Sequence, residues 1–76
     1  MQQLRFQLNR EFVQLNQLLK LTGFADSGGA GKALVAAGGV SVDGSPEFRK
    51  TCKIRVGQVV TLGNVEITVV AGEPVA

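Results

Sequence analysis

The chain has 76 residues, 45% of them hydrophobic, and a net charge of +2. This is enough for one small domain and too little for a core plus an enclosed reaction chamber. With no histidine and a single cysteine, Cys52, the chain has no imidazole base, internal disulfide or cysteine- and histidine-rich metal site. We find no secretory signal and no apolar run of the ~20 residues that a membrane helix needs, so we expect a cytoplasmic protein without a membrane partner.

The first part of the chain predicts a strand followed by a helix. Leu4, Phe6 and Leu8 alternate with polar residues, and a period of two is typical of a half-buried strand. Leucines at i, i+3 and i+4 then form one apolar stripe, which predicts a helix over residues 15–21. Gly23 can adopt the left-handed conformation just past a helix end, so the helix is expected to stop there.

A second helix is predicted over residues 28–37. Asp26 or Ser27 can serve as its N-cap, because a short side-chain oxygen accepts from the free amides of a first turn. Glycines in this helix weaken it by up to ~1 kcal/mol each against alanine, which indicates that the backbone meets something closely there. The side expected to pack on the first helix consists of small or apolar residues: Ala30, Ala33, Leu34 and Ala37.

The rest of the chain is predicted to be β-structure. Asp43-Gly44 is a tight-turn signal, and Pro46 favours an edge or irregular strand. The expected strands occupy residues 40–42, 59–62 and 65–70, and a frayed tail is expected at residues 72–76. The predicted fold class is α+β: two short helices packed on a small, mainly antiparallel sheet. We expect a single domain over residues 1–76 with its core in residues 12–70.

Positive charge gathers in one segment. Four of the seven residues from 49 to 55 are cationic and none is acidic: Arg49, Lys50, Lys53 and Arg55. Such a cluster on a nearly neutral chain favours an anionic partner, although a solvated loop without a partner is equally compatible with the charges alone. Phe48, an aromatic residue, directly precedes this segment.

Nucleotide-binding patterns fail in the second predicted helix. The run from Ser27 to Lys32 lacks the first glycine and the metal-binding hydroxyl of a Walker loop, since Asp26 and Ala33 stand there. What remains is a helix N-terminus that can receive a phosphate through its amides or be an ordinary cap. Lys20 and Lys32 would flank that phosphate if the helices were antiparallel neighbours; otherwise they are solvated surface lysines.

Catalytic patterns are missing as well. The acidic residues show no pairing suited to general acid–base chemistry, so we predict no enzymatic activity. Cys52 stands in a basic context that would lower its pKa if it were exposed. Without a histidine to pair with, a structural cysteine is the better interpretation.

Several stretches occur in an ordered spacing. They are Leu15-Asn16-Gln17-Leu18-Leu19-Lys20-Leu21-Thr22-Gly23, Ser27-Gly28-Gly29-x-x-Lys32, Gly39-Val40-Ser41-Val42-Asp43-Gly44, Arg49-Lys50 and Val56-Gly57-Gln58-Val59-Val60. Together, over residues 12–70, they resemble the RNA-binding domain named after small-subunit ribosomal protein four (the S-four, or αL, domain), especially its small stand-alone bacterial members. The chain departs from the family pattern at three positions. Many family members have a basic residue where this chain has Gln14 and Gly29, and asparagine where it has Asp43.

The resemblance implies non-catalytic binding to structured RNA, with ribosomal and transfer RNA as candidates. We also expect a monomer that needs no cofactor, metal or small-molecule substrate, since the sequence offers no ligands for a metal or cofactor. Carried over position by position, the contact face is formed by the two helices and the following β-turn region, with Lys20, Ser27, Gly28, Lys32, Arg49, Lys50, Lys53 and Arg55. Such a face suits helical RNA, which is recognised by its shape and by phosphate and 2′-OH contacts. The alternative hypothesis is a protein-interaction module that presents the same basic face to an acidic partner.

Overall fold

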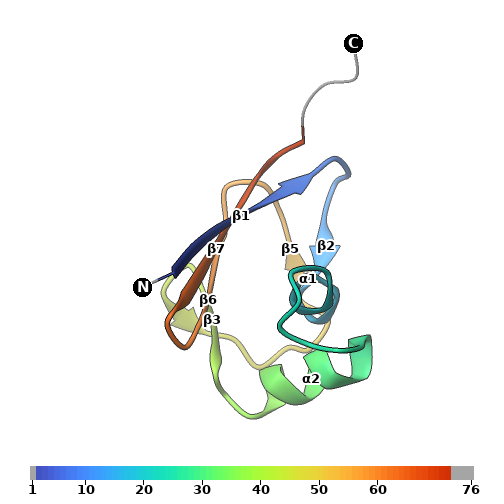
Figure 1. Cartoon of the computed structure of the whole chain (residues 1–76), viewed down its shortest axis with the longest axis vertical. Coiled ribbons are helices and arrows are strands. Elements are labelled where there is room, and N and C mark those ends of the chain that lie inside the picture. Colours follow the sequence, from blue (N-terminus) through green and yellow to red (C-terminus); the bar gives the residue numbers. More distant parts are fainter. Residues whose placement is uncertain (1, 73–76) are drawn as a thin grey trace.

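The computed structural model describes residues 2–72, which form two helices and two sheets (Figure 1). In chain order the elements are β1 (Gln2–Leu8), β2 (Val13–Gln14), α1 (Leu15–Leu21), α2 (Gly28–Ala36), β3 (Val40–Val42), β4 (Ser45–Pro46), β5 (Lys53–Ile54), β6 (Val59–Leu62) and β7 (Val65–Ala71). The prediction for α1 is confirmed at both ends, and α2 ends one residue earlier than predicted. The strand β2 was not predicted, because two residues carry no periodicity.

The main sheet has the strand order β1-β7-β6-β3-β4. Strand β1 lies parallel to β7, with Phe6 beside Val69, and the other neighbours in this sheet are antiparallel. Pro46 lies in the edge strand β4, as expected for a residue without an amide to donate. Strands β2 and β5 form a separate antiparallel pair, in which Val13 faces Ile54. The predicted α+β architecture with a mainly antiparallel sheet is confirmed.

The predicted turn after β3 is present and is tied to β6. Asp43 and Gly44 both have positive φ, 51° and 84°, the combination of the tight hairpin turn that matches strand twist. The amide of Asp43 donates to the carbonyl oxygen of Val59 (2.8 Å), and the amide of Val59 donates to Asp43 Oδ1 (2.9 Å). The strained backbone of Asp43 is therefore stabilised by bonds to the neighbouring strand.

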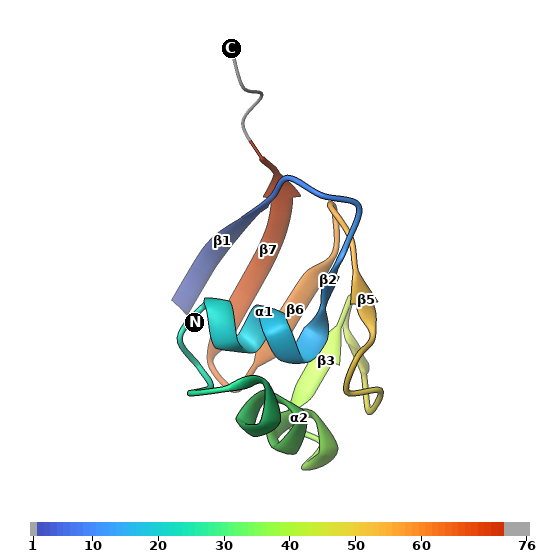
Figure 2. The ribbon, with the colours of Figure 1, turned by 90° about the vertical axis from the view of Figure 1, so that its right-hand side faces the viewer.

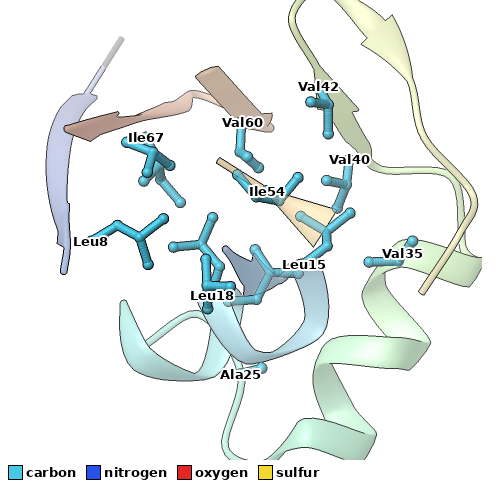
Figure 3. Close-up of a cluster of buried hydrophobic side chains, with 13 residues drawn as sticks. Leu8, Leu15, Leu18, Ala25, Val35, Val40, Val42, Ile54, Val60 and Ile67 are labelled. Atoms are coloured by element: carbon cyan, nitrogen blue, oxygen red, sulfur yellow. The ribbon is translucent and has the colours of Figure 1, made fainter. Parts of the chain in front are cut away.

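The core lies between α1 and the main sheet (Figures 2 and 3). The predicted apolar stripe of α1 is completely buried, because Leu15, Leu18 and Leu19 each have 0% exposure. The other buried residues of this cluster come from every other helix and strand except β4, and from the segment before α2: Leu8, Val13, Ala25, Val35, Val40, Val42, Ile54, Val60, Ile67 and Val69. Leu8 in this cluster shows that β1, which precedes the stretch with the family resemblance, contributes to the core.

The two helices touch through a glycine. A Cβ built on Gly31 would lie 2.5 Å from the backbone oxygen of Asn16 in α1, so only glycine permits this approach. The packing side expected for α2 is therefore partly wrong: Gly31 and Val35 are buried, whereas Ala33 and Ala37 are exposed. The helices approach most closely at Gly31, because this residue has no side chain. The face of α2 that contacts α1 is therefore turned away from Ala33 and Ala37.

The end of β7 is followed by Gly72, whose amide donates to the carbonyl oxygen of Leu8 (2.8 Å). The other residues of the expected frayed tail, 73–76, lie outside the described residues. Among the helices of residues 2–72, none is long and apolar enough to cross a membrane.

Candidate functional site

Residues 48–53, which we call the basic loop, lead from β4 into β5 and run past α2 in Figure 1. The carboxylate of Glu47, just before this loop, accepts hydrogen bonds from the amide, Nε and Nη2 of Arg49 at 3.0, 3.0 and 2.9 Å. These bonds from Arg49 lower the pKa of Glu47 from 4.5 to about 2, and the pairing raises the pKa of Arg49. Arg49 is therefore already paired with the carboxylate that directly precedes the basic loop.

The basic loop also caps the start of α1. Gln14, the N-cap residue, offers no side-chain hydrogen bond to the helix. Instead the amide of Leu15 donates to the carbonyl oxygen of Cys52 (2.8 Å), and the amide of Asn16 donates to that of Lys50 (3.1 Å). Because the first amides of a helix have no partner within it, these two bonds stabilise α1 and hold the loop in place.

Asn16 joins the basic loop to α2. Its side chain is 2% exposed, and its Nδ2 donates to the carbonyl oxygen of Gly28 in the first turn of α2 (3.4 Å). Its backbone oxygen is also the atom that faces Gly31. The buried Asn16 thus contacts α2 twice, while its backbone amide is bonded to the basic loop. It therefore connects α1, α2 and the loop.

A shallow groove of about 790 Å³ lies between α2 and the basic loop. Its lining combines one helix residue with the whole loop: Lys32, Phe48, Arg49, Lys50, Thr51, Cys52 and Lys53. No carboxylate within residues 2–72 forms an ion pair with Lys32, Lys50 or Lys53. The groove therefore carries a positive charge that the described part of the chain does not neutralise.

Phe12 and Glu11 contact the two cations at the C-terminal end of the basic loop and just after it, Lys53 and Arg55. Lys53 Nζ lies 4.9 Å from the centroid of the Phe12 ring, and Arg55 Cζ lies 5.9 Å from it, distances at which cation–π attraction operates. Arg55 also pairs with Glu11 at 3.3 Å, and both side chains are exposed. Arg55 does not line the groove.

The N-terminus of α2 is partly capped. Ser27, rather than Asp26, is the N-cap residue, and its Oγ accepts from the amide of Ala30 at 3.1 Å. The helix begins beside the first turn of α1, because a Cβ on Gly28 would lie 3.0 Å from Gln17 Nε2. Lys20 follows Gln17 by one turn on the same side of α1; it is exposed and does not line the groove.

The environment of Cys52 agrees with the interpretation as a structural cysteine. Its side chain is partly buried, and Sγ donates to Glu47 Oε1 at 3.5 Å. Desolvation by burial, together with this carboxylate, raises the pKa of Cys52 and outweighs the lowering by Arg49. The basic residues around it thus do not produce a reactive thiolate. Across residues 2–72 there is also no cluster of three side chains suited to hold a metal ion.

The family model described as "S4 domain" matches residues 6–70. The chain belongs to the S4 domain family. It is 48% identical, over 59 residues that cover 78% of this chain and 84% of the relative, to the Escherichia coli (strain K12) protein "Putative RNA-binding protein YbcJ". It has the same identity and coverage with the Shigella flexneri protein "Uncharacterized protein YbcJ".

A solved structure supports the same assignment. The solution structure of YbcJ from E. coli, described as having an αL motif involved in RNA binding, matches with a TM-score of 0.63 and 39% identity. The match covers 93% of this chain and 89% of that chain. The resemblance stated from the sequence is therefore confirmed at the level of family and fold.

In this S4 domain, sequence reasoning missed two residues that organise the groove. Glu47 carries no signal beyond its position two residues before Arg49, and its role depends on how the loop folds. Asn16 lies within the helix stretch that carries the family resemblance, yet the helical pattern does not mark it as buried. Both act through contacts that no local pattern encodes.

Proposed function

We propose that this S4 domain binds structured RNA without catalysis, through the groove between α2 and the basic loop. The observation that carries the proposal is the convergence of Lys32 from α2 with Lys50 and Lys53 from the loop around one groove. Three lysines without carboxylate partners in residues 2–72 provide an electrostatic surface for phosphates. The names given to the E. coli relative and to its solved structure support RNA as the partner.

The remaining predicted contacts are proposed to extend this surface. Ser27 and Gly28 begin α2, where free amides and the helix dipole favour a phosphate oxygen. Lys20 would contact the same phosphate from α1. Arg55 must exchange its partner Glu11 for a phosphate, which is feasible because exposed surface pairs are weak and screened by salt. Arg49 keeps its bonds to Glu47 and would contact RNA through the guanidinium N–H groups that Glu47 does not use.

The rigid arrangement suits helical RNA. An RNA helix is recognised by its shape and by phosphate and 2′-OH contacts across its shallow groove, and the bonds of Asn16 connect α2 to the loop. Ribosomal and transfer RNA remain the candidate targets, and the proposed location is the cytoplasm, where both occur. We propose that the protein acts as a monomer.

Gel-shift titration of transfer RNA and of a ribosomal RNA hairpin tests the proposal. The double variant Lys50→Glu, Lys53→Glu should lose binding, and Lys32→Glu should weaken it. The matched control is Arg5→Glu, Arg10→Glu, which changes the net charge equally at exposed positions outside the groove and should retain binding. Equal losses in both double variants would show that net charge alone drives association and would refute the assignment of the groove.

Salt dependence and purification give a second test. About four or five phosphate contacts predict a log–log salt slope of about −3 to −4, and removing two of them should make it shallower by about 1.5. RNA should remain with the protein through nuclease-free purification and disappear after nuclease treatment. If instead an acidic protein co-purifies and no RNA does, the protein-interaction hypothesis is the correct one.

A further inference from the structure

Phe48 is the exposed aromatic residue of the groove. It is 62% exposed and lines the same groove as Lys32 and Lys50. The edge of its ring rests on Gly38, just after α2, where a Cβ would lie 3.2 Å from Phe48 Cε1. The ring is thus supported at one edge, while most of its surface faces solvent beside the lysines.

The backbone on both sides of Phe48 is held in place. The amide of Glu47 donates to the carbonyl oxygen of Val40 in β3 (3.0 Å), and the amide of Arg49 donates to the Glu47 carboxylate (3.0 Å). A side chain that is already positioned loses little conformational entropy when a ligand binds to it. The held backbone and the contact of the ring with Gly38 therefore restrict where Phe48 lies within residues 2–72.

A flat apolar ring flanked by cations matches one kind of RNA element. An unpaired nucleotide can stack its base on an aromatic ring while its phosphates contact neighbouring lysines, whereas a fully paired helix keeps its bases stacked inside and offers phosphates and 2′-OH groups. We infer that Phe48 stacks on one unpaired base, so the RNA preferred by this groove is a helix interrupted by a bulge or ending in a loop. This inference rests on the proposed function and adds the class of RNA to it.

The experiment compares two RNA hairpins of the same stem sequence, one fully paired and one with a single bulged 2-aminopurine. Wild-type protein should bind the bulged hairpin about tenfold more tightly, since stacking on an aromatic side chain is worth about that factor or more per base. It should also quench the 2-aminopurine fluorescence. Phe48→Leu, which keeps an apolar side chain and loses the aromatic face, should bind both hairpins equally and leave the fluorescence unquenched. Phe48→Trp should restore the preference and the quenching.

The outcomes separate this inference from the proposed function. If Phe48→Leu keeps the preference for the bulged hairpin, or weakens binding to both hairpins alike, the stacking inference is overturned. If the lysine variant Lys50→Glu, Lys53→Glu still loses the paired hairpin in that case, the proposed function stands without it. If wild-type protein binds neither hairpin, both fail.

Discussion

Gly31→Ala tests whether the close approach of α1 and α2 limits the stability of the fold. The added Cβ would lie 2.5 Å from the backbone oxygen of Asn16 and 3.1 Å from its carbonyl carbon. Neither atom belongs to a flexible side chain, so the helices must separate or shift. The bond from Asn16 Nδ2 to Gly28 would be strained by the same movement.

Two opposing effects determine the size of the change. Alanine favours a helix over glycine by ~1 kcal/mol, whereas overpacking a closely packed contact costs ~1–3 kcal/mol and occasionally more. A clash with backbone belongs at the upper end of that range, so we expect a net loss of ~1–2 kcal/mol in the free energy of unfolding. For a domain of this size the melting temperature should then fall by roughly 4–16 °C.

Urea unfolding followed by far-ultraviolet circular dichroism measures this loss, with equal m-values confirming that only stability changed. Gly29→Ala is the matched control in the same helix. Its Cβ would meet only Ser27 Oγ, at 3.8 Å, so it should leave stability unchanged or raise it by up to ~1 kcal/mol. A Gly31→Ala variant as stable as wild type would refute the argument that this helix contact requires glycine.

Three further predictions concern the carboxylate, the thiol and the helix cap. The pKa of Glu47 falls from 4.5 to about 2 on folding, so its contribution to stability is complete above pH 4.5 and is lost as the pH falls toward 2. In urea titrations, the Glu47→Gln variant should lose less stability across that pH window than the wild type. Parallel pH profiles of the two proteins would contradict the pairing of Glu47 with Arg49. The raised pKa of Cys52 predicts that iodoacetamide alkylates it more slowly than a small free thiol at mildly alkaline pH, and a rate equal to that of the free thiol would disprove its shielding. Thermal melting should show that Ser27→Ala costs ~1 kcal/mol of stability and that Ser27→Asn costs much less. Equal losses in the two variants would mean that the bond from the Ala30 amide to the side chain of residue 27 is unimportant.

The sequence alone was sufficient for elements set by interactions within a few residues. The bounds of α1 and the turn at Asp43-Gly44 depend on periodicity and on the backbone freedom of particular residues, and both were predicted correctly. The cap of α2 was narrowed to Asp26 or Ser27, and the structure selects Ser27. The family resemblance belongs with them, since it depends on the order and spacing of such local patterns.

The candidate site depended on contacts between segments that are distant in the chain. Only the tertiary structure could show that Asn16 is buried against Gly28, that Gly31 forms the helix contact, and that Lys32 meets the basic loop. It also divided the predicted cations into those with a carboxylate partner within residues 2–72 and those without one, which the charge count cannot do. The reason is physical: a helix pattern reports which face of a segment is apolar, whereas burial, pairing and convergence depend on where the chain places other segments against it.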